Sequence, residues 1–157
     1  MIIVCELIPL LAALLYYKYA PKDPLKLTLV AWLTLAVLSF MPCSTTLSNV
    51  AIRRIHSILS TRSFSELFLN IFINNLFVLI LCFIIGKAYL GYIIATTAFV
   101  ARALAKGYPI TVVFGAHTVL ELYAYSISTS KNLKNLAKAF LYLIVAALIE
   151  SWFIHKG

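Results

Sequence analysis

The sequence predicts an all-α, polytopic transmembrane bundle of about six membrane helices with one interfacial amphipathic helix. The first observation is composition: 63% of the 157 residues are hydrophobic and 11% are charged, whereas a soluble domain is about half apolar and a quarter charged. The second is that apolar stretches of helical length alternate with short polar segments rich in Pro, Gly and Lys. The third is that no alternating strand pattern or internal repeat stands out. We therefore expect one integral membrane domain, residues 1–157, in a multi-pass protein of the cell membrane.

Each expected membrane segment is an apolar stretch that ends at an interfacial cluster or a helix-breaking residue. The first ends in aromatic residues and a lysine at Tyr16 to Tyr19, which is typical of a membrane interface. The second stops at Pro42, because proline removes a backbone donor and clashes with the preceding turn. Whether the first segment spans the bilayer completely stays open. The expected segments are residues 2–17, 25–41, 64–85, 89–106, 110–128 and 133–154.

Residues 44–65 have a different pattern, with an apolar stripe on one face of a helix and polar side chains on the other. This predicts an amphipathic helix that lies in the membrane interface. The alternative is a polar connecting helix packed on the bundle, and neither would span the membrane. The stripe is Val50, Ile52, Ile55, Ile58 and Leu59, and the polar face is Arg53, Arg54, His56, Ser57 and Ser60.

The formal net charge of +8 is scattered over the segments between helices. This distribution suits lipid headgroups and topology determinants. A nucleic-acid surface would instead need a basic face with interleaved aromatic residues, so we expect the lipid bilayer as a partner and no nucleic acid. Lys and Arg are nearly balanced between the two sides of the expected bundle, and the orientation stays open.

The three cysteines, Cys5, Cys43 and Cys82, form an odd set without a CxxC spacing. Cys5 and Cys82 lie in apolar stretches, where cysteine usually acts as a small core residue. The sequence therefore predicts neither a disulfide framework nor a zinc site, and no cofactor is expected.

Two groups of residues indicate contacts between helices. Asparagines within a membrane helix usually hydrogen-bond to a neighbouring helix, and small residues allow two helices to approach closely. We expect the small residues to support self-association into a homo-oligomer. The asparagines are Asn70, Asn74 and Asn75, and the small residues are Gly91, Ala95 and Ala98.

His117 and Glu121 form the central polar pair, because a spacing of four residues places both on one helix face. An acid at this depth costs about 2.5 kcal/mol or more. The pair could be a buried polar contact that fixes helix packing, or it could be a proton relay. It could also supply two ligands to a metal ion, but the sequence shows no third ligand. Hydrolysis would need an activated nucleophile that the sequence does not contain. We expect no catalytic residue and no resident metal.

The other ionisable residues lie nearer the helix ends. Glu6, Glu150, Arg102 and Lys106 are expected to reach the interface or to form ion pairs there. Arg102, Lys106 and Glu150 are the candidate ion-pairing residues.

Residues 64–157 resemble the stage II sporulation protein M family of integral membrane proteins. The resemblance rests on residues 68–76, which contain Asn74 and Asn75, on the helix containing Gly91, and on residues 116–124. At the positions that correspond to residues 116–124, the family often has Pro-His-Gly, two apolar residues, Glu, an apolar residue, Pro and Ala. His117 and Glu121 match this pattern, whereas Ala116, Thr118 and Tyr123 depart from it.

The resemblance implies a non-enzymatic scaffold or subunit of a membrane complex, with other membrane proteins as partners. Family members resemble membrane anchors that recruit cell-wall hydrolases in spore formers, and relatives occur in archaea. The alternative is a transporter or channel component in which His117 and Glu121 handle protons or cations.

Overall fold

The structure is a computed structural model that describes residues 2–61, 63–104 and 115–156, and every regular element in these ranges is an α-helix. The all-α prediction is confirmed, and helix α4 has the bounds expected from the sequence. In chain order the helices are α1 (Ile2–Tyr19), α2 (Pro24–Ser39), α3 (Thr46–Leu59), α4 (Phe64–Ile85), α5 (Lys87–Leu104), α7 (Ala116–Ser128) and α8 (Leu133–Lys156).

Local sequence explains where several helices begin and end. Asp23 caps α2, because its side chain accepts a hydrogen bond of 2.9 Å from the backbone N–H of Lys26. Thr45 and Ser48 form a reciprocal capping box at the start of α3. Gly86 ends α4 with a φ of 88°, a backbone conformation that other residues rarely adopt.

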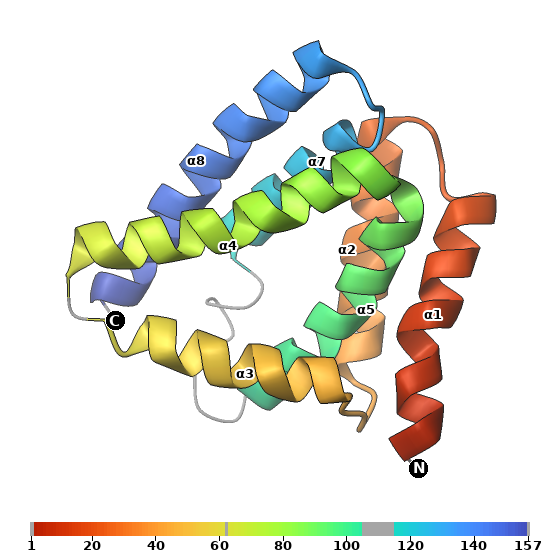
Figure 1. Cartoon of the computed structure of the whole chain (residues 1–157), viewed down its shortest axis with the longest axis horizontal. Helices are drawn as coiled ribbons and strands as arrows, with labels where there is room; N and C mark the ends of the chain where they lie inside the picture. Colours follow the sequence, from red (N-terminus) through yellow and green to blue (C-terminus); the bar gives the residue numbers. More distant parts are fainter. Residues whose placement is uncertain (1, 62, 105–114, 157) are drawn as a thin grey trace.

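Helices α1, α2 and α5 stand side by side on one side of the molecule, while α4 and α8 run obliquely across the other (Figure 1). Helix α5 carries a cationic side chain near each end, and each one donates a hydrogen bond to a backbone carbonyl just after a neighbouring helix. Lys87 Nζ donates to the carbonyl of Ala20, just after α1, over 2.9 Å. Arg102 Nη1 donates to the carbonyl of Phe40, just after α2, over 2.6 Å. Helix α5 is therefore antiparallel to α1 and parallel to α2.

Two of the described helices, α4 and α8, are long and apolar enough to cross a membrane. They have 22 and 24 residues, and a rise of about 1.5 Å per residue carries either one across a hydrocarbon core of about 30 Å. Helices α2 and α7 have 16 and 13 residues and are too short to do so when straight. The structure thus gives fewer candidate spans than the six expected. The first residues of the expected segment 110–128 lie outside the described residues.

Helix α3 turns part of its apolar stripe toward the bundle, while Val50 of the stripe is 48% exposed. Ile55 and Ile58 line the interior, whereas Arg53 and Arg54 are exposed on the opposite face. Helix α3 packs on α5 and α4 and lies along one edge of the molecule (Figure 1). Of the two alternatives for this segment, the structure favours the connecting helix packed on the bundle.

The start of α1 is attached to the start of α3 by a disulfide and two hydrogen bonds. Cys5 and Cys43 are joined with a Cα–Cα distance of 5.5 Å, within the range of ordinary disulfides. Glu6 Oε1 accepts from the backbone N–H and the hydroxyl of Thr46 at 2.6 and 2.9 Å. The expectation of no disulfide is therefore wrong. A separation of 38 residues gives no sequence motif, and only the packing of α1 brings the two cysteines together.

The small residues of α5 face the interior of their own chain. A Cβ atom at Gly91 would lie 2.6 Å from the carbonyl oxygen of Ala12 and 2.7 Å from Cγ of Tyr16, so α1 covers this position. Ala95 and Ala98 are completely buried. The close helix approach expected from these residues is present, but it occurs within the chain. Self-association through this face is therefore not available, and self-association through another surface stays a prediction.

Replacing Gly91 with Ala should destabilise the protein, because the added methyl group would overlap the α1 backbone. We expect a loss of about 1–3 kcal/mol, seen as a lower unfolding midpoint in detergent. Ala137→Leu, which adds volume at an exposed position of α8, is the control and should leave the midpoint nearly unchanged. Alanine is normally better than glycine in a helix by about 1 kcal/mol. A midpoint at or above that of the wild type would contradict the α1–α5 packing.

Candidate functional site

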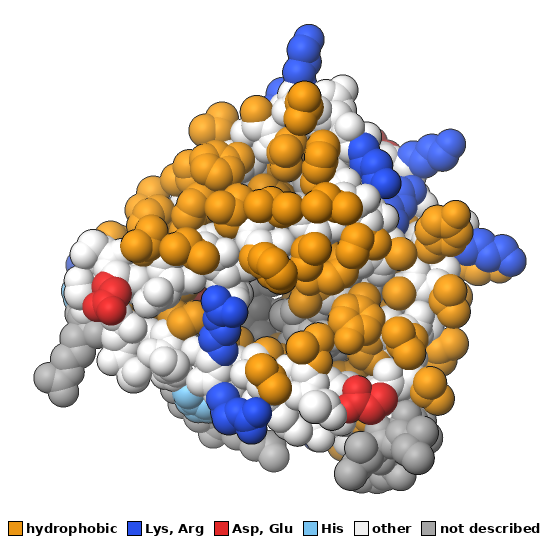
Figure 2. Space-filling model, in the orientation of Figure 1, with side chains coloured by type: hydrophobic (Ala, Val, Ile, Leu, Met, Phe, Trp, Pro, Cys, Tyr) orange, Lys and Arg blue, Asp and Glu red, His pale blue; other side chains and the backbone are white. Residues whose placement is uncertain are grey.

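A cavity of about 350 Å³ lies between the helices and is lined by residues of every described helix except α1. We call it the central cavity. Most of its wall is apolar, and Figure 2 shows the molecular surface hollowed between α4 and α3. The amide, imidazole and carboxyl side chains on the wall are Asn74, Asn75, His117, Glu121 and Glu150.

The two carboxyl groups on the wall lie within hydrogen-bonding reach of each other, although they are 29 residues apart in the sequence (150 − 121). Asn75 Nδ2 also donates a hydrogen bond to Oε1 of Glu121. Asn74 Nδ2 lies 3.5 Å from Oδ1 of Asn75, a long contact. The polar contacts thus run from α4 through Glu121 on α7 to Glu150 on α8. We call Glu121 and Glu150 the carboxyl pair.

Helical periodicity directs the carboxyl pair inward. On α7, Glu121 follows the buried His117 by four residues and precedes the buried Tyr125 by four. On α8, Glu150 continues the buried row of Leu143 and Ala147 at steps of four and three residues. The packing of α7 against α8 then brings the two rows together.

The carboxyl pair needs a proton or a cation to be stable. A carboxylate oxygen only accepts hydrogen bonds, so a bond between two carboxyl groups requires a proton on one of them. No Lys or Arg is among the described residues that line the cavity. Two carboxylates in an apolar cavity would repel each other and lose their hydration. The arrangement can therefore bind and release a proton, or hold a small cation between the two groups.

The structure brings together most of the predicted polar residues, with one change of role. Glu150 was expected to form an ion pair at a helix end, and this prediction is wrong, because its side chain meets Glu121. Its position in the buried row of α8 was the signal that could have revealed this. His117 is buried and lines the cavity. Asn70 is not among the lining residues.

Of the two cations predicted to form ion pairs, Arg102 does not line the central cavity. Arg102 donates to the carbonyl of Phe40 instead, because the end of α5 lies against the end of α2. Lys106 lies outside the described residues. No group of three or more His, Cys, Asp or Glu side chains that could hold a metal ion is found among the described residues.

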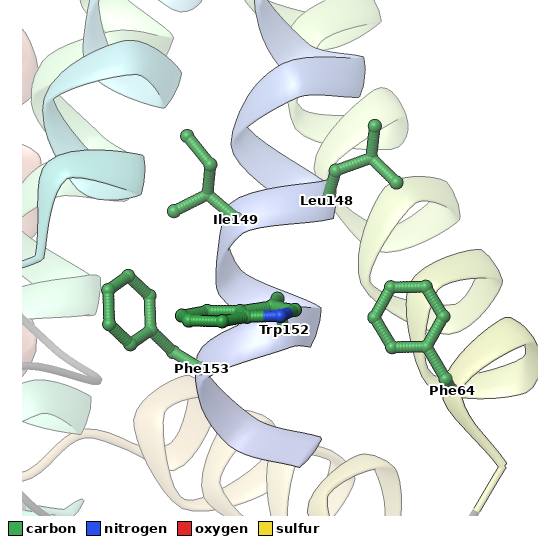
Figure 3. Close-up of a pocket in the computed structure, with 5 residues that line it drawn as sticks. All are labelled: Phe64, Leu148, Ile149, Trp152 and Phe153. Atoms are coloured by element: carbon green, nitrogen blue, oxygen red, sulfur yellow. The ribbon is translucent and has the colours of Figure 1, made fainter. Parts of the chain in front are cut away.

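A second hollow, between the start of α4 and the end of α8, is an open apolar groove. Figure 3 shows its five residues, with Phe64 on α4 and the others on α8. The rings of Trp152 and Phe153 are in edge contact, with centroids 5.4 Å apart. The groove presents no titratable side chain, so the candidate site is the central cavity.

Comparison of the chain with models of protein families, with curated proteins and with solved structures finds no match.

Replacing Asn75 with Ala should leave a carboxyl oxygen of Glu121 without its amide donor. We expect a loss of about 1–3 kcal/mol, measured as the unfolding midpoint in detergent. Asn70→Ala is a matched control, because it removes the same side chain five residues earlier on the same helix, where it does not line the cavity. Equal effects of the two substitutions would contradict a specific role for the contact between Asn75 and Glu121.

Proposed function

We propose that this chain is a multi-pass integral membrane protein of non-enzymatic function, in which the carboxyl pair takes up and releases a proton or a small cation. In this role it is a component of a transporter or channel. The observation that carries the proposal is the position of the carboxyl pair on the wall of a cavity that has no lysine or arginine among its described lining residues. Ionisable groups within a membrane bundle usually serve ion or proton movement.

The outer surface supports the membrane location. Large apolar side chains are exposed along α1, α2, α4 and α8, including Leu14 at 66%, Leu29 at 59%, Ile84 at 59% and Leu141 at 63%. Hydrophobic side chains cover much of the face over α4 and α8 (Figure 2). Soluble monomers rarely expose contiguous apolar surface on this scale, whereas lipid chains would cover it without cost.

A membrane scaffold is the second candidate function. It is favoured by the contacts from Asn75 through Glu121 to Glu150, which join three helices and would fix their packing. The resemblance to the stage II sporulation protein M family supports this role, with other membrane proteins or a second copy as partners.

Glu121→Gln should abolish proton flux into liposomes while leaving the folded protein intact, because an amide keeps the shape of the carboxyl group but cannot exchange a proton. Flux is measured with an internal pH-sensitive dye under an imposed potential. Glu66→Gln, which neutralises an exposed acid in the first turn of α4, is the control and should retain wild-type flux.

The infrared spectrum gives an independent measurement on the same variants. We expect the wild type to show the carbonyl band of a protonated carboxyl group that is lost in Glu121→Gln and Glu150→Gln but kept in Glu66→Gln. Wild-type protein without proton or cation flux, combined with normal folding of Glu121→Gln, would remove the transport role and leave the scaffold.

A further inference from the structure

One end of the bundle carries most of the lysines. The hydrogen bond from Lys87 to Ala20 places the start of α5 beside the turn between α1 and α2. A Cβ atom at Gly86 would lie 3.7 Å from Cε of Lys131, which places the turn between α7 and α8 at the same end. We call this the lysine end, and cationic side chains project from it in Figure 2. Its seven lysines are Lys18, Lys22, Lys26, Lys87, Lys131, Lys134 and Lys138, with Asp23 as the acid between them.

The opposite end carries the disulfide between Cys5 and Cys43, and we call it the disulfide end. Arg102 reaches the carbonyl of Phe40 there. The rings of Phe64 and His155 meet with centroids 5.8 Å apart, which places the start of α4 beside the end of α8. The described cations of this end are Arg53, Arg54, Arg102 and Lys156.

The two candidate membrane helices connect the two ends in opposite directions. Helix α4 starts near His155 at the disulfide end and finishes at Gly86 near Lys131, while α8 starts just after Lys131 and returns. In a membrane, the lysine end and the disulfide end would therefore lie on opposite sides of the bilayer.

The disulfide gives one means of distinguishing the two sides of the membrane, and the distribution of cationic side chains gives another. Disulfides form and persist in oxidising compartments and are rare in the reducing cytoplasm. Lys and Arg next to membrane helices are enriched on the cytoplasmic side, where the leaflet carries anionic lipid headgroups. Among the described residues, seven of these cations lie at the lysine end and four at the disulfide end. Both rules give the same orientation here.

We infer that the disulfide end faces the extracytoplasmic, oxidising side of the membrane and that the lysine end binds anionic phospholipid headgroups of the cytoplasmic leaflet. This inference rests on the membrane location of the proposed function but not on its transport chemistry. It also places α3, with Arg53 and Arg54 on its outer face, on the extracytoplasmic side of the central cavity.

The first experiment tests the disulfide in the full chain within the membrane of an expressing bacterium. Free thiols are blocked in lysed cells, the sample is reduced, and new thiols are labelled with a polyethylene glycol maleimide. Two labels should appear after reduction, and none when the reduction is omitted. Cys5→Ser is the control, because it frees Cys43 for blocking and should abolish both labels. Absence of labels after reduction of the wild type would overturn the inference.

The second experiment tests the orientation with single exposed cysteines in a Cys82→Ser background. Arg54→Cys should react with a membrane-impermeant maleimide in intact spheroplasts. Lys134→Cys should react only after the membrane is permeabilised. The labelling experiment above verifies that the native disulfide is intact in both variants.

The opposite labelling pattern, or protection of both positions until the membrane is permeabilised, would overturn the orientation. Reaction of both positions in intact spheroplasts would overturn it as well. Proton flux and retention in the membrane fraction are measured on the same samples, so failure of the orientation can be told apart from failure of the proposed function.

Discussion

The contact between the carboxyl groups of Glu121 and Glu150 constrains the arrangement of α4, α7 and α8. Each group would be costly to bury by itself, so α7 and α8 must pack in the register that places the two together. Asn75 adds the amide donor from α4. The apolar surfaces of these helices permit many packings, whereas the polar contact is satisfied in very few. The polar groups on the cavity wall thus select one arrangement from those that hydrophobic contact alone would allow.

The other half of the bundle is organised by α5. This helix accepts α1 closely at Gly91, where no side chain intervenes. Its cations Lys87 and Arg102 satisfy carbonyl groups that follow α1 and α2. Backbone carbonyls at the C-terminal end of a helix have no partner within that helix. These two contacts therefore fix the positions of α1 and α2 along the axis of α5. The central cavity lies where this half meets the half that contains the carboxyl pair.

At the disulfide end, helix α3 connects the same two halves. Cys5 and Glu6 hold the start of α1 against residues Cys43 and Thr46, immediately before and within the first turn of α3. Helix α3 then crosses to α4 with Ile55 and Ile58 toward the cavity. The wall of the candidate site therefore depends on contacts made at the edge of the molecule, well away from the carboxyl pair in the sequence.

Local patterns in the sequence were sufficient to predict where the helices lie and which of their faces are apolar. Apolar stretches and breakers such as Pro24 and Gly86 set the helix limits, because caps and backbone restrictions act within a few residues. The spacing of His117 and Glu121 predicted one shared helix face, and both residues line the central cavity. Pairings between distant residues were decided only by tertiary structure. Glu150 meets Glu121 and Cys5 meets Cys43 because helices pack in one register, and that register depends on side chains from several helices at once.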